Sequence, residues 1–128
     1  MTRPNIPDDV RRFILLAIPS VPYLEALLLM RRGGPVGWRA GALASGLYLS
    51  EKAAAGLLAQ LHTAGVVAAD GADGNSFRYA PAADLAAMID QLADIYAVNL
   101  IGVSTLIHST SGKKAQHFAD AFHFRKGH

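Results

Sequence analysis

The stretch between residues 50 and 80 constrains the fold of this chain more than any other part of its sequence. Ser50 is a residue type that caps helices, and Gly65, fifteen residues later, is a typical helix stop. Between them, four apolar residues recur at the i, i+3, i+4, i+7 spacing of one helix face. These residues are Ala54, Leu57, Leu58 and Leu61. The spacing predicts a helix over residues 50–64.

Two short apolar runs follow this helix. Residues 66–69 and 77–80 have the composition of strands, and the loop between them, 70–75, is dense in Asp, Gly and Asn. Because two such runs joined by a turn-rich loop pair with each other, we expect a β-hairpin directly after the helix.

The residues before this stretch predict further helices. Two acidic residues suit the first turn of a helix that Pro19 closes, and a second helix ends at Gly33. Residues 36–39 form a short extended piece, and residues 42–47 a brief helix.

A long helix is expected after the hairpin. From Leu85 to Leu106, residues of one helix face recur at alternating spacings of four and three, the heptad pattern of helices that pack side by side. The pattern predicts one unbroken helix from Pro81 to about Thr110. A chain of this size cannot cover the whole stripe, so we expect part of it to pack on a second copy. The predicted dimer interface comprises Leu85, Ile89, Leu92, Tyr96, Asn99, Val103 and Leu106.

Asn99 is the polar member of this predicted interface. A polar residue in such a position typically fixes the register of two helices by pairing with its counterpart. The alternative is that its side chain bonds to a nearby backbone group within one subunit.

Five short segments carry a recognisable pattern. They are Ala42-Leu43-Ala44, Leu47-Tyr48-Leu49-Ser50, Ala53 to Leu61, Ala64-Gly65-Val66-Val67 and Tyr79-Ala80-Pro81. Together they resemble the winged helix-turn-helix domains of bacterial transcriptional regulators. The multiple-antibiotic-resistance-regulator (MarR) type is similar because its flanking helices dimerise. The resemblance spans about a third of the chain.

The resemblance implies that the helix over 50–64 enters the DNA major groove and that the loop 70–75 is a wing beside the minor groove. The implied function is that of a homodimeric transcriptional regulator that binds double-stranded DNA. The alternative is a winged-helix module that binds another protein and not DNA. The expected DNA contacts are Arg39, Ser50, Lys52, Ala55, Gln60 and Arg78.

The distribution of charge keeps the protein-binding alternative open. Residues 1–49 and 113–128 each carry a net charge of +3, whereas residues 50–112 carry −4. Lys52 is the single cation on the outward side of the predicted recognition helix, and the wing loop contains Asp70 and Asp73. DNA binding depends on cations that neutralise phosphates, and this part of the chain has few.

The expected fold class is mainly α with a small β-hairpin wing (α+β), a winged helix-turn-helix with a long C-terminal dimerisation helix. We expect one domain with four parts. They are the N-terminal helices (1–35), the winged core (36–81), the dimerisation helix (82–111) and a tail helix (112–128). In the tail, Phe118 and Phe122 share a helix face, which must dock either on the same dimer or on a partner protein.

No pattern in the sequence predicts catalysis, a cofactor or a metal centre. The five histidines lack metal-binding spacing, cysteine is absent, and no serine lies in a nucleophile elbow. We therefore expect a protein that is not an enzyme. We also expect a cytoplasmic location without a membrane partner, because neither a signal peptide nor a span of roughly 20 apolar residues is visible.

Overall fold

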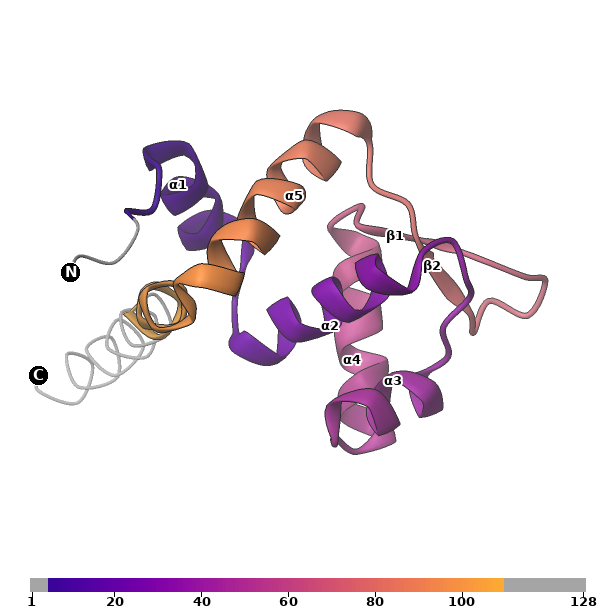
Figure 1. Cartoon of the computed structure of the whole chain (residues 1–128). Helices are drawn as coiled ribbons and strands as arrows, with labels where there is room; N and C mark the ends of the chain where they lie inside the picture. Colours follow the sequence, from indigo (N-terminus) through magenta and orange to yellow (C-terminus); the bar gives the residue numbers. More distant parts are fainter. Residues whose placement is uncertain (1–4, 110–128) are drawn as a thin grey trace, which may run out of the picture. The chain divides into compact units, whose positions relative to one another are not determined.

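The computed structural model describes residues 5–109, and this part of the chain is mainly helical with a small two-stranded antiparallel sheet (Figure 1). The elements are α1 (Asp8–Ala17), α2 (Val21–Gly33), α3 (Ala40–Leu47), α4 (Glu51–Thr63), β1 (Val67–Ala69), β2 (Phe77–Tyr79) and α5 (Ala83–Val98). A further helix spans Leu100–Ser109. The prediction of a mainly α chain with a small β-hairpin is confirmed.

The described residues group into two compact units, whereas the sequence predicts one domain. One unit is Pro22–Ala93, which contains α2, α3, α4 and the hairpin. The other combines residues 5–21 with residues 94–109. Helix α5 begins in the first unit and ends in the second.

The limits of α1 follow from its local sequence. Pro7 occupies the N-cap position, and Asp8 and Asp9 lie in the first turn, where the positive end of the helix dipole favours carboxylates. The helix ends two residues before Pro19, which could not continue the hydrogen-bond ladder. Val10 and Ile14 are buried on one face of α1.

Helices α3 and α4 pack against each other and support the candidate site. The Ser50 hydroxyl accepts the Ala53 N–H at 3.0 Å, so Ser50 caps α4 as the sequence predicts. The buried face of α4 packs on α3 and β1. It consists of the four predicted residues, Ala54, Leu57, Leu58 and Leu61.

The turn between α3 and α4 has a left-handed residue that is not glycine. Tyr48 has φ 58° and ψ 44° and is the one positive-φ non-glycine residue in the described range. The next residue, Leu49, donates its N–H to the Ala44 carbonyl at 3.0 Å, which closes the end of α3. The Tyr48 side chain is 95% exposed and packs on nothing that would offset the strained backbone.

Gly65 ends α4 and directs the chain into the hairpin. Its φ of 80° is a conformation that residues with a Cβ rarely adopt. Gly65 donates its N–H to His62 at 3.1 Å, and Val66 donates to Leu61 at 3.0 Å. This pair of bonds is a Schellman motif, which satisfies carbonyls at the end of α4.

The predicted hairpin is confirmed. Strands β1 and β2 are antiparallel, with Val67 opposite Tyr79 and Ala69 opposite Phe77. On its other side, Phe77 exchanges two backbone hydrogen bonds with Trp38, at 2.6 and 2.9 Å. The predicted extended piece at residues 36–39 therefore adds one paired residue beside β2.

The prediction of one helix over residues 82–111 is wrong, because the helix breaks at Asn99. Helix α5 ends at Val98, and the next helix starts at Leu100 after a sharp bend. The Asn99 Oδ1 atom accepts the Gly102 N–H at 3.1 Å, so Asn99 caps the second helix. This is the alternative role expected for Asn99, a bond to nearby backbone within one subunit.

The predicted tail helix over 112–128, with its docking residues Phe118 and Phe122, lies outside the described residues. Inside them, no single helix combines the length and apolar character needed to cross a bilayer. Two pairs of consecutive helices reach that length together, and each pair is sharply bent where its members join.

Candidate nucleic-acid interface

The outward face of α4 is exposed along its length. Of the predicted contacts on this helix, Lys52, Ala55 and Gln60 are all exposed, as is the capping residue Ser50. Between them lie the small residues Gly56 and Ala59. The face therefore offers much smooth surface and few groups that hydrogen-bond to base edges.

A groove of about 690 Å³ borders this face. One wall comes from the start of α3, one from α4, and one from the loop between β1 and β2. The groove is lined by Arg39, Ala40, Gly41, Ala42, Glu51, Ala55, Leu58, Ala59, Gly74, Asn75 and Phe77. The structure thus brings two of the predicted contacts, Arg39 and Ala55, to one depression.

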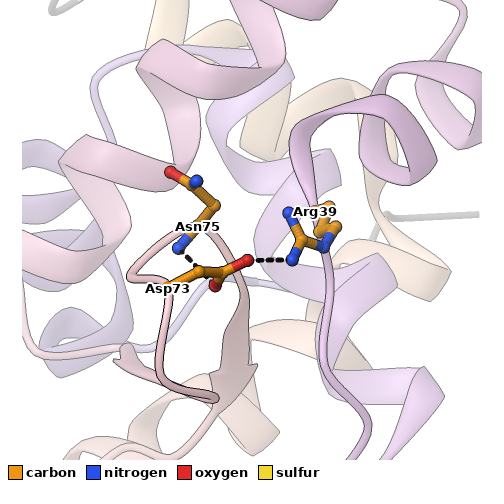
Figure 2. Close-up of polar contacts among 3 residues, drawn as sticks. All are labelled: Arg39, Asp73 and Asn75. Carbon is orange, nitrogen blue, oxygen red and sulfur yellow. Dashed lines mark hydrogen bonds and ion pairs between the residues drawn. The ribbon is translucent and has the colours of Figure 1, made fainter.

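Arg39 forms an ion pair with the loop between the strands (Figure 2). It lies at the N-cap position of α3, and its Nη2 atom contacts Oδ2 of Asp73, 34 residues later in the chain. The other carboxylate oxygen of Asp73, Oδ1, accepts the Asn75 N–H at 3.1 Å. Asp73 therefore joins the loop to the start of α3.

The two partners also hold Asp73 in its charged form. The Asn75 N–H contributes most and Arg39 next, and together they lower the pKa of the Asp73 carboxyl from its usual range. Because this pKa is lowered, the carboxylate takes up a proton at a lower pH than an ordinary Asp does. The ion pair with Arg39 is therefore present at neutral and mildly acidic pH.

Two other arginines also face carboxylates. Arg78 on β2 has its Nε atom 3.9 Å from Oδ1 of Asp70, at the base of the same loop. Arg31 in the last turn of α2 donates from Nε to Asp90 of α5 at 2.9 Å. By contrast, Lys52 makes no ion pair with any described residue.

The ion pairs are what sequence reasoning missed. The acidic loop residues Asp70 and Asp73 and the basic residues Arg39 and Arg78 were each visible in the sequence. Asp70 and Arg78 carry opposite charges and belong to one predicted hairpin, which was a signal for the ion pair between them. No local signal linked Asp73 to Arg39, because α3 and α4 lie between them in the chain.

The predicted dimer interface is largely buried within a single copy. Leu85 and Leu106 are half-buried. The other five members are buried, namely Ile89, Leu92, Tyr96, Asn99 and Val103. Because the helix breaks at Asn99, these residues also do not form one straight stripe. A second copy would need a different surface, or a rearrangement that exposes this one.

Among residues 5–109, no group of three or more His, Asp or Glu side chains is arranged to hold a metal ion. No family model, no curated protein and no solved structure matches this chain.

Proposed function

We propose that this chain is a winged helix-turn-helix protein that binds double-stranded DNA and acts as a homodimeric transcriptional regulator. One observation carries the proposal. Helix α4, capped by Ser50, leads directly into the β1–β2 hairpin, and its exposed face and the hairpin loop border the same groove. A helix and a hairpin loop placed in this way suit the major and minor grooves of a duplex.

In this arrangement, one DNA strand crosses the groove between α4 and the loop. Lys52 and the N-terminus of α4 face phosphates, and Gln60 faces base edges. Arg39 and Arg78 border the crossing strand from the start of α3 and from β2. Because few of these groups read bases, we expect binding that depends more on phosphates than on sequence.

Binding to a labelled duplex of random sequence tests this proposal. Two copies with one free Lys52 each make about two phosphate contacts, so affinity should fall roughly tenfold between about 50 and 200 mM salt. Ala55→Glu places bulk and negative charge on the exposed face of α4 and should weaken binding by about tenfold or more. Fluorescence anisotropy measures both effects.

Ala87→Glu is the matched control, because Ala87 is an exposed helical alanine of α5 in the same compact unit. It changes the net charge equally and should alter affinity by no more than about twofold. An affinity that does not change with salt, or that falls equally in both variants, would contradict the role of α4 in DNA binding.

The homodimer belongs to the same proposal. In the unit formed by residues 5–21 and 94–109, several large apolar side chains are exposed, including Leu16 (81%), Val98 (64%) and Ile101 (57%). Exposed apolar side chains of this size commonly mark interfaces. We propose that a second copy covers them, which doubles the DNA contacts.

Sedimentation equilibrium at micromolar concentration should give the mass of two chains. Ile101→Glu should shift the mass toward one chain, because a carboxylate is costly to bury in an interface. Ala87→Glu, at an exposed helical position of the other compact unit, is its control and should leave the dimer intact. A wild-type protein that sediments as one chain would remove the dimer from the proposal.

A protein-binding module is the second candidate, and the character of the groove favours it. Ala55 and Ala59 give α4 a smooth small-residue face, and Phe77 adds apolar surface to the groove. Such a surface suits a helix or strand of another protein. If random duplex does not bind at low salt, this candidate takes precedence.

A further inference from the structure

We propose that the hairpin loop carries its own competitor for DNA: Asp73, and with it Asp70, occupies the arginines that would otherwise bind phosphates. This inference rests on the proposed function and concerns how tightly the protein binds DNA. It concerns two ion pairs, Arg39 with Asp73 and Arg78 with Asp70. Each joins a predicted DNA contact to a carboxylate of the same hairpin loop.

The Arg39–Asp73 pair lies where a phosphate would have to bind. Arg39 and Asn75 line the groove beside α4, and Arg39 and Asp73 line a second depression of about 480 Å³ on the loop. Arg39 therefore borders both depressions. Asp73 contacts one guanidinium nitrogen, Nη2, and its negative charge offsets the positive charge that would attract a phosphate, so Asp73 and a DNA phosphate compete for this group.

Asp73 is also aimed at Arg39 by a second bond. Its Oδ1 atom accepts the Asn75 N–H, which leaves Oδ2 directed at the arginine (Figure 2). A carboxylate that is held in this way loses little further freedom when it pairs. This distinguishes Asp73 from an acidic side chain that only happens to lie nearby.

The pair is nevertheless weak enough to be displaced. Both side chains are well exposed, Arg39 at 59% and Asp73 at 44%. Exposed ion pairs contribute little and are screened by salt. A closely spaced row of DNA phosphates can therefore displace Asp73 from Arg39. The free energy of the broken ion pair then lowers the affinity for DNA. The Arg78–Asp70 pair, at 3.9 Å, adds a smaller effect of the same kind.

Asp73→Asn tests this inference, because it keeps the shape of the side chain and removes its charge. The variant should bind random duplex about fivefold more tightly than the wild type at low salt. The dependence of log affinity on log salt should steepen by about 0.9 for each copy that gains a phosphate contact. Asp70→Asn should change both quantities in the same direction by less.

Two controls separate competition for Arg39 from a general change in charge. Asp94→Asn alters the net charge equally at an exposed position of α5, and Asp94 makes no ion pair with a described residue. It should change affinity by less than about twofold. In an Arg39→Gln background, Asp73→Asn should give no gain, since the arginine it releases is missing. Circular dichroism melting confirms that each variant is folded.

Each outcome decides the matter. A gain that needs Arg39 supports the inference, as does a variant that binds when the wild type does not. Equal gains from Asp73→Asn and Asp94→Asn, or a gain that survives Arg39→Gln, would overturn it while leaving DNA binding intact. Weaker binding by Asp73→Asn would also overturn it and would show that Asp73 positions the loop for DNA. If no protein in the series binds duplex, the proposed function fails and the inference with it.

Discussion

Leu61→Ala should lower the free energy of unfolding by about 3 kcal/mol. Leu61 is fully buried on the face of α4 that packs against α3 and β1. Truncation removes the apolar contacts of the side chain and leaves a cavity that the rigid helix pair cannot fill by collapse. Urea unfolding followed by circular dichroism gives the difference directly, provided that the two proteins have the same dependence on denaturant.

Gln60→Ala is the matched control, one position earlier on the same helix. Gln60 is exposed, and alanine is a good helix former, so the change should stay within about 0.5 kcal/mol. If Leu61→Ala cost no more than Gln60→Ala, the assignment of the buried face of α4 would be wrong.

Asn99→Ala should lower the free energy of unfolding by about 1 to 2 kcal/mol. The side chain is 7% exposed and accepts the Gly102 N–H, the bond that starts the helix after the bend. Alanine would leave that N–H without its acceptor. Thermal melting followed by circular dichroism measures the loss.

Asn99→Ser tests whether capping is the cause. A serine hydroxyl can accept the same N–H, so this variant should keep most of the stability that Asn99→Ala loses. Gly102→Ala offers an independent check, because a Cβ at residue 102 would lie 2.5 to 2.8 Å from the side-chain amide atoms of Asn99. It should be destabilising although alanine is the better helix former. Equal stability of the wild type and Asn99→Ala would argue against the cap.

The parts of the fold that were predictable have strong local signals. Ser50 and Gly65 bound α4 because a cap and a left-handed glycine act within a few residues of themselves. The loop between the strands is composed of turn residues, and it yields a hairpin with the expected pairing. Each of these features could be located without knowledge of the rest of the chain.

The break at Asn99 was not predictable from periodicity, because two helices that meet at a bend satisfy the same spacing as one. The alternation of four and three residues continues through Asn99 without a gap. The asparagine can act either as a member of a helix–helix interface or as an N-cap, and tertiary packing decides between these two roles. A glycine three residues later, where the capped N–H lies, was the one local hint.

For the candidate site, the residues were predictable but their pairing was not. Arg39, Lys52 and Ala55 were expected among the DNA contacts, and all three are exposed. The path of the folded chain places Arg39 in contact with Asp73. It places no acidic side chain of the described residues in contact with Lys52. Charges near in space and distant in sequence leave no periodic signature.

The double pairing of Phe77 has a consequence for behaviour at high concentration. Because Ala69 lies against one side of Phe77 and Trp38 against the other, β2 is already flanked at this residue. The outer strand β1 is three residues long. A strand edge this short offers another chain few backbone N–H and C=O groups to pair with. This disfavours growth of intermolecular β-structure from the folded hairpin.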